Sequence, residues 1–178
     1  LSLARFASWG PGGLGRGTEC CGQGARRPRF GVMTSPHPLI ITEPAQIGVI
    51  ALDARRVAVL GIKPDSHRDQ PAYYVPAYLD SVGVEVIPVP VYYPEVKEIL
   101  GLPVERDLRR LRDIDVCVVF RRPEDVADHV PALIAMRPKC VWLQAGIRDD
   151  ASALKLAEAG IAVVQDRCIM VEHRRARL

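Results

Sequence analysis

No long hydrophobic run is present in this sequence. None of its 178 residues belongs to a stretch approaching the roughly 18 to 20 apolar residues that a membrane-spanning helix needs. The first ten residues, Leu1 to Gly10, are too short and too mixed for a convincing secretory signal, and no clear small-residue cleavage site follows them. We therefore expect no membrane partner.

The sequence also has no spacing of cysteine or histidine that indicates a disulfide framework or a metal site. Of the five cysteines, Cys20 and Cys21 are adjacent, whereas Cys117, Cys140 and Cys168 lie in or beside predicted strands. The four histidines are scattered, and no His-Glu-x-x-His motif occurs. We expect buried, reduced thiols in a cytoplasmic protein, and no metal.

An excess of positive charge is missing from most of the chain. The whole sequence carries a net charge of +3, but residues 1–32 contain five arginines and one acidic residue. Residues 33–178 contain 19 basic and 20 acidic residues. Because nucleic-acid binding usually needs a basic face, we expect no nucleic-acid partner.

The beginning of the chain differs in composition from the rest. Residues 1–32 are rich in glycine and arginine and show no apolar periodicity, so we expect a disordered or artefactual extension with Met33 as the natural start. An Arg/Gly-rich tail that binds nucleic acid is the alternative. Residues 42–178 are predicted to form a single domain, which begins with Thr42 as the cap of a short helix.

Five apolar runs alternate with helical segments along this predicted domain. The predicted strands are 56–61, 84–89, 114–120, 140–144 and 161–165. The predicted helices are 73–82, 94–100, 104–112, 123–136, 149–159 (capped by Asp149 or Asp150) and a terminal helix from residue 168. Strands that are apolar throughout are typical of a sheet covered on both faces, and right-handed crossovers make such a sheet parallel.

The predicted fold class is therefore α/β: a doubly wound, five-stranded parallel sheet, Rossmann-like, in the order 3-2-1-4-5. We place the switch point between the strands at 56–61 and 114–120. In such sheets, ligands bind beyond the carboxyl ends of the strands. The loops that follow the strands are therefore the candidate site.

The loop after the first strand contains only Gly61 where a dinucleotide-binding loop has the pattern G-x-G-x-x-G. Lys63, His67 and Arg68 could hold a phosphate there. Two aspartates balance much of this charge, so a solvated loop is a comparable interpretation. After the second strand, Tyr92 and Tyr93 could flank a ligand or pack over the sheet edge.

Arginines follow the third strand in Phe120-Arg121-Arg122-Pro123. Arg121 or Arg122 could reach a phosphate, or could pair with Glu124 or Asp125 in the next helical turn, an interaction that contributes little to stability.

After the fourth strand, Gln144 could donate or accept a hydrogen bond, and Gly146 permits a close approach of the backbone. For Trp142 we favour core packing. Cys168 has no evident base and orienting partner, so a structural thiol beside Arg167 is favoured over a nucleophile.

The segments 119–124, 141–147 and 163–168 closely resemble the small CoA-binding proteins. That family is Rossmann-like and related to the CoA-binding domain of the succinyl-CoA synthetase alpha subunit and of NDP-forming acyl-CoA synthetases. The resemblance covers roughly residues 45–175, with departures at Lys63, where the family usually has Ser or Thr, and at Pro90-Val91, where it usually has Asn-Pro.

The resemblance implies non-catalytic binding of coenzyme A or an acyl-CoA as the small-molecule partner. The implied binding residues are Gly61, Ile62, Lys63, Arg68, Pro88, Val89, Pro90, Phe120, Arg121, Arg122, Gln144, Gly146, Ile147 and Arg167.

Two alternatives stay open. An NAD(P)-binding oxidoreductase-like domain shares the fold, but the glycine pattern and an acidic residue after the second strand are both missing. A ligand-controlled interaction module would dock a partner through a terminal helix from Val171 to Leu178, whose arginine-rich end could equally be a disordered tail.

Overall fold

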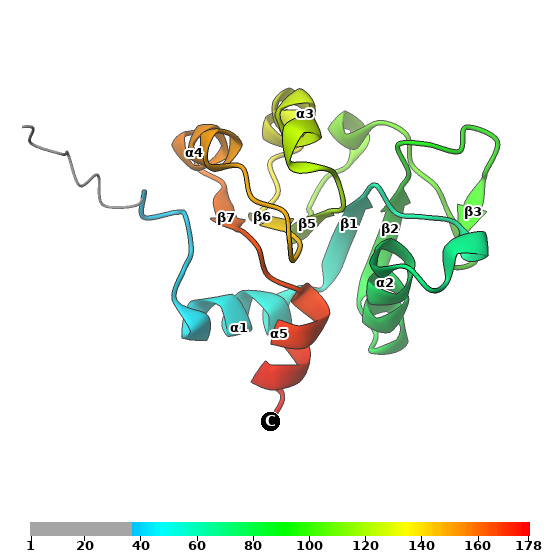
Figure 1. Cartoon of the computed structure of the whole chain (residues 1–178), viewed down its shortest axis with the longest axis horizontal. Helices are drawn as coiled ribbons and strands as arrows, with labels where there is room; N and C mark the ends of the chain where they lie inside the picture. Colours follow the sequence, from blue (N-terminus) through cyan, green and yellow to red (C-terminus); the bar gives the residue numbers. More distant parts are fainter. Residues whose placement is uncertain (1–36) are drawn as a thin grey trace, which may run out of the picture. The chain divides into compact units, whose positions relative to one another are not determined.

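The computed structural model describes residues 37–178, and a sheet of five parallel strands forms its middle layer. The order across the sheet is β2-β1-β5-β6-β7 (Figure 1). The strands are β1 (Arg56–Leu60), β2 (Glu85–Val89), β5 (Val116–Val119), β6 (Cys140–Leu143) and β7 (Ala162–Val164). A separate hairpin joins β3 (Glu98–Ile99) to β4 (Leu102–Pro103).

Helices cover both faces of the sheet. They are α1 (Pro44–Asp53), α2 (Pro71–Ser81), α3 (Pro123–Met136), α4 (Asp150–Glu158) and α5 (Ile169–Ala176), with 3₁₀ turns η1 (Asp65–His67) and η2 (Leu108–Arg110). The helices α3 and α4 lie on one face, and α1, α2 and α5 lie on the other (Figure 1). Each helical layer buries one of two hydrophobic clusters against the sheet, which explains why the strands are apolar throughout.

The predicted fold class is confirmed, and one detail of its topology is wrong. Counted along the chain, the five parallel strands lie in the order 2-1-3-4-5 rather than 3-2-1-4-5, because β5 pairs with β1. All four residues of β5 are buried, so this strand suits the centre of the sheet and not an edge. The predicted switch point between β1 and β5 is correct.

The segment between β2 and β5 differs most from the prediction. The predicted helix over 94–100 is replaced by the β3–β4 hairpin, whose turn residues Leu100 and Gly101 both have positive φ angles, 59° and 71°. Two-residue hairpin turns require this conformation. The predicted helix over 104–112 is reduced to the single turn η2.

Local signals for the remaining helices were more reliable. The helix over 123–136 has its predicted bounds, α2 and α4 lie within two residues of theirs, and the Asp149 side chain caps α4 by accepting from the Ala151 and Ser152 N–H groups. Thr42 is not a cap: Glu43 occupies that position without a side-chain hydrogen bond.

Residues before Thr42 also contact the sheet, since Ile40 forms a bridge with Val163 in β7. The predicted extension over 1–32 lies outside the described residues. Across residues 37–178, every helix is too short or too polar to cross a membrane.

Candidate functional site

The switch point is built around a close contact between the chain segments that leave β1 and β5. Gly61 has a φ angle of +84°, and its N–H donates to the Val89 carbonyl over 2.8 Å. A Cβ atom at this position would lie 2.3 Å from the Phe120 carbonyl oxygen. Glycine is therefore required at this position, both for its backbone conformation and for the space it leaves.

A cavity of about 550 Å³ opens beside this contact, between the start of α2 and the carboxyl ends of β5 and β6. Five of the residues predicted for the site line it, namely Phe120, Arg121, Arg122, Gln144 and Ile147. The other lining residues are Gln70, Pro71, Ala72, Tyr74, Val75, Pro123, Ala145 and Cys168. We refer to this space as the switch-point cavity.

Two polar groups on its wall have no hydrogen-bond partner in the described part of the protein. Gln144 is 3% exposed, and its Nε2 atom is unpaired. The Nε atom of Arg121 is also buried and unpaired, although the Nη2 atom of the same guanidinium donates to Asp125 Oδ2 over 2.7 Å. A buried polar atom without a partner is costly, so each of these two atoms would be stabilised by an acceptor that reached it.

The alternative expected for Arg121, an ion pair in the next helical turn, is therefore present with Asp125. This ion pair does not involve the whole guanidinium, because Nε has no partner among the described residues. The guanidinium also lies 5.1 Å from the centre of the Tyr92 ring. Arg122 is exposed at the rim of the cavity.

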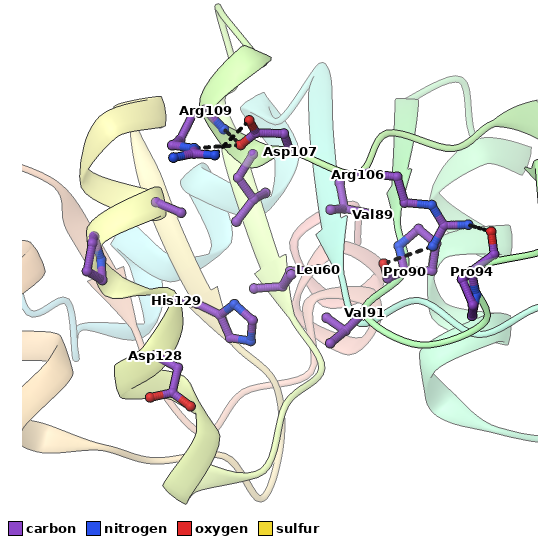
Figure 2. Close-up of a pocket in the computed structure, with 13 residues that line it drawn as sticks. Leu60, Val89, Pro90, Val91, Pro94, Arg106, Asp107, Arg109, Asp128 and His129 are labelled. Carbon is purple, nitrogen blue, oxygen red and sulfur yellow. Dashed lines mark hydrogen bonds and ion pairs between the residues drawn. The ribbon is translucent and has the colours of Figure 1, made fainter.

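A second cavity, of about 710 Å³, lies between the end of β2, η2 and α3 (Figure 2). Val89 and Pro90 line it, as the sequence predicted for the site, together with Arg106 and His129. Burial, and next the positive charge of Arg121, lower the pKa of His129 against the opposing effect of neighbouring aspartates. These surroundings favour the neutral imidazole.

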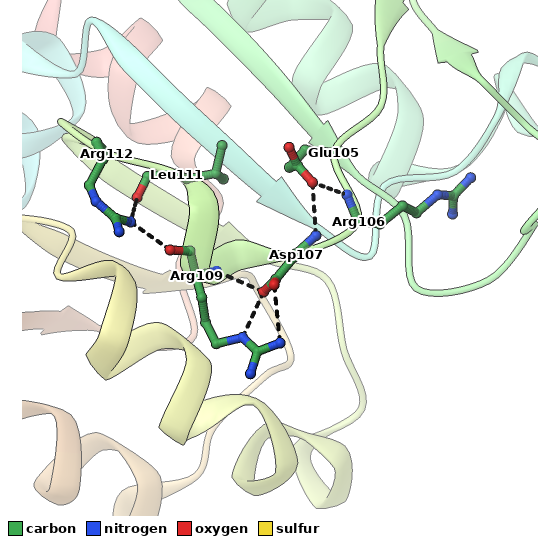
Figure 3. A network of polar contacts seen from close by, with 6 residues as sticks. All are labelled: Glu105, Arg106, Asp107, Arg109, Leu111 and Arg112. Carbon is green, nitrogen blue, oxygen red and sulfur yellow. Dashed lines mark hydrogen bonds and ion pairs between the residues drawn. The ribbon is translucent and has the colours of Figure 1, made fainter.

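Arg106 holds the loop that follows β2. Its guanidinium donates to the Tyr93 carbonyl over 2.9 Å and to the Val96 carbonyl. It also donates to the Pro90 and Pro94 carbonyls over 3.4 and 3.5 Å (Figure 2). The segment carrying Arg106 is itself held, since the Glu105 carboxylate accepts from the Arg106 and Asp107 N–H groups over 2.7 and 3.0 Å (Figure 3). The loop with both tyrosines is thus anchored by Arg106, which lies on the same side of the second cavity as Pro90 and Pro94 (Figure 2).

The same loop is connected to the loop after β1. The Tyr93 hydroxyl lies 3.4 Å from His67 Nε2, and the two rings are 5.5 Å apart. Together with the position of Arg121 over Tyr92, this contact links three loops at the carboxyl edge of the sheet.

The structure does not bring the predicted cationic loop into either cavity. Lys63 Nζ donates to Gln70 Oε1, and the Arg68 guanidinium lies 5.9 Å from the centre of the Tyr73 ring. Ile62 is 1% exposed and belongs to the hydrophobic core. Within the described residues, these side chains are engaged by the protein itself.

The remaining residues predicted for the site, Pro88, Gly146 and Arg167, lie outside the switch-point cavity. Pro88 is buried in β2, and its carbonyl accepts from Glu105 N–H over 2.8 Å. Gly146, with φ +80°, donates to Asp166 Oδ1 over 2.7 Å. Arg167 lines a different hollow and lies 3.8 Å from Glu172, so it is not placed at the switch-point cavity.

Trp142 packs in the core as favoured from the sequence: it is 0% exposed, and its Nε1 donates to the Arg167 carbonyl over 2.7 Å.

Several lining residues were missed from the sequence. Gln70 and Tyr74 lie at the start of α2, which Pro71 at the first helical position could have indicated. Arg106 and His129 had no such signal, because only the tertiary structure brings them toward the loop after β2. Among residues 37–178, no three His, Cys, Asp or Glu side chains are grouped as a metal site would require.

Comparison with known proteins agrees with this geometry. The model of the CoA binding domain family matches residues 55–174. A solved structure from Thermus thermophilus (cell-free ID.343) is 40% identical, with a TM-score of 0.68, over 76% of this chain and 99% of that one. A protein from Pyrococcus horikoshii OT3 is 30% identical, also with a TM-score of 0.68, over 77% of this chain and 94% of its own.

A curated relative, the uncharacterised protein YneT of Bacillus subtilis strain 168, is 29% identical over 72% of this chain and 93% of its own length. The family model spans well over half of the sequence, including β1, β5, β6 and the loops around the switch-point cavity. The chain therefore belongs to the CoA-binding domain family.

Proposed function

We propose that this protein binds coenzyme A or an acyl-CoA reversibly in the switch-point cavity and does not transform it. The observation that carries the proposal is the unpaired Gln144 Nε2 on the wall of that cavity, in a chain of the CoA-binding domain family. The pantetheine arm of CoA contains two amides, whose carbonyl oxygens are the acceptors that this buried N–H group needs.

The charge around the cavity suits the anionic part of the same ligand. CoA carries a pyrophosphate and a 3′-phosphate, and Arg121 and Arg122 lie on the cavity wall and rim. Guanidinium groups bind phosphates with two parallel hydrogen bonds, which favours arginine at such a site. The apolar surfaces of Phe120, Tyr74 and Ile147 complete the wall and suit the methyl-bearing arm.

The loop after β1 would contribute by exchanging partners. Lys63 stands where the family usually has a hydroxyl residue, and its ammonium group is bonded to Gln70, a residue of the cavity wall. A phosphate near the start of α2 would offer this ammonium group a charge-assisted bond in place of the neutral one with Gln70. The departure at Lys63 is thus compatible with binding.

The absence of catalytic turnover is proposed from the surroundings of the cavity's thiol. A cysteine that catalyses acyl transfer needs an adjacent base, and the histidine nearest in sequence to Cys168 is His173. His173 Nδ1 lies 2.9 Å from the Tyr78 hydroxyl, and the ring is buried between α5 and α2. This histidine is therefore engaged elsewhere.

Calorimetric titration of the full chain with CoA, dephospho-CoA and NAD tests the proposal. We expect CoA to bind most tightly, with weaker binding when the 3′-phosphate is missing and weaker still for NAD. Preference for NAD would favour the oxidoreductase-like alternative, and binding of none of the three would overturn the proposal.

A matched pair of variants tests the role of Gln144. Gln144→Leu removes the unpaired amide at similar volume, and one lost hydrogen bond of about 0.5–1.5 kcal/mol predicts a roughly 2- to 13-fold weaker CoA affinity. Gln46→Leu makes the same change on the exposed surface of α1, away from the cavity, and should leave the affinity unchanged. Equal affinities for the two variants would contradict the assignment of Gln144.

Incubation with acetyl-CoA checks the non-catalytic part. Release of free CoA at the rate of a buffer blank is expected, whereas multiple turnover by the protein would contradict it.

A further inference from the structure

Cys168 is placed differently from the other thiols of the described residues. Cys117 and Cys140 are buried in β5 and β6, and burial raises the pKa of both thiols, which keeps them protonated and unreactive. Cys168 is only partly buried, at the start of α5, and it lines the switch-point cavity. Of these three thiols, it alone faces a space that a ligand can enter.

The polar groups on the cavity wall follow the ends of strands that are successive neighbours in the sheet, in the order β1, β5, β6 and β7. Gln70 and Pro71 lie at the start of α2, Arg121 and Arg122 follow β5, and Gln144 follows β6 before Cys168 is reached after β7. A ligand whose anionic part binds the arginines, and whose amide accepts from Gln144, therefore extends its far end toward Cys168. In CoA that far end is a thiol.

We propose that Cys168 forms a mixed disulfide with the CoA bound in the switch-point cavity, so that the site holds CoA covalently under oxidising conditions. This inference rests on the proposed function. It is carried by two independent observations: the accessible thiol on the cavity wall, and the buried, unpaired Gln144 Nε2 on the same wall.

The step is a thiol–disulfide exchange with a disulfide of CoA as the co-reactant. The Cys168 thiolate attacks the CoA sulfur, a bond forms between these two sulfurs, and the original S–S bond breaks. The second sulfur leaves as a thiolate and takes up the proton that Cys168 released. One disulfide replaces another, so no further oxidant is needed, and an excess of small thiol reverses the reaction.

The experiment uses the full chain carrying Cys20→Ser and Cys21→Ser, because these two cysteines lie outside the described residues. The protein is incubated with CoA disulfide, and its mass is measured without reductant, followed by peptide mapping. We expect one CoA per chain, attached at Cys168 and released by reductant. The same chain with Cys168→Ser should gain no CoA.

Two controls separate the cavity from simple thiol reactivity. Desulfo-CoA, which has no thiol, should compete for the cavity and suppress the adduct. A small disulfide without a nucleotide, such as cystamine, should modify Cys168 at least roughly tenfold more slowly, because binding places the CoA sulfur beside Cys168. Equal rates for the two disulfides would overturn the proposal.

The failure of this inference is distinguishable from failure of the proposed function. Reversible CoA binding in the presence of reductant, combined with no adduct at Cys168, would overturn the mixed disulfide and leave the proposed function standing. If CoA and desulfo-CoA both fail to bind, the proposed function and the mixed disulfide are overturned together. The CoA affinity of the Cys168→Ser chain, measured in reductant, shows whether that variant has kept the site.

Discussion

Replacing Gly61 by alanine perturbs the contact that forms the switch point. The backbone at Gly61 has φ +84°, and the added methyl would lie 2.3 Å from the Phe120 carbonyl oxygen. Real Cβ contacts essentially never fall below 3.0 Å, so the segments leaving β1 and β5 must separate. The substitution therefore carries both backbone strain and a steric displacement.

The size of each contribution follows from a second glycine. Gly83 has nearly the same φ angle, +87°, but a Cβ there would meet nothing within 4 Å. Gly83→Ala should therefore cost only the left-handed strain, about 1–2 kcal/mol. Gly61→Ala should cost that strain plus an overpacking penalty of about 1–3 kcal/mol, giving roughly 2–5 kcal/mol in total.

Urea unfolding of both variants and the parent measures these costs, as changes in the free energy of unfolding at an unchanged m-value. We also expect Gly61→Ala to weaken CoA binding, because the displaced Phe120 lines the switch-point cavity. If the two variants differ by less than about 0.5 kcal/mol, within the ordinary range for surface changes, the close contact at Gly61 is not what the geometry indicates.

Two further predictions concern Asp115, just before β5, and Arg106, which holds the loop after β2. Burial raises the pKa of Asp115, but its hydrogen bond with Lys139 and two backbone N–H groups outweigh this effect and hold the pKa below its usual value. The stability that this carboxylate contributes is present above its unfolded pKa and is lost as pH falls through the folded pKa. Asp115→Asn should therefore make the free energy of unfolding fall less steeply as the pH is lowered. An unchanged pH dependence would contradict this prediction. Arg106→Ala should speed amide hydrogen exchange in the loop after β2, because the Tyr93 carbonyl loses its donor, and should weaken CoA binding by a few-fold at most. The control Arg110→Ala, at an exposed position, should change neither the exchange nor the affinity. Equal exchange rates in the two variants would argue against the anchoring role of Arg106.

Most of the fold could be predicted from local patterns in the sequence. Uninterrupted apolar runs identified the five parallel strands, since a strand covered on both faces has no polar side to present. Pro123 marked the start of α3, and Asp149 marked that of α4, because these residues stabilise a helix terminus within one turn. Such signals depend on neighbouring residues and need no knowledge of the rest of the chain.

The path from β2 to β5 could not be read in the same way. Residues 94–100 have helix-forming composition, but Leu100 and Gly101 take positive φ angles in a hairpin turn, and the segment continues along the outer edge of β2. The position of β5 beside β1 is likewise decided by which strands bury both faces of β5, a property of the assembled sheet.

For the candidate site, local patterns were enough to indicate which strand ends contribute to it, because parallel strands all end at one edge of the sheet. Phe120, Arg121 and Gln144 were found by this rule and do line one cavity. Which polar groups remain available to a ligand depends on contacts between segments far apart in the sequence. Lys63 and Arg167 meet protein partners, whereas Gln144 Nε2 meets none among residues 37–178. Long-range packing determines whether a side chain finds such a partner.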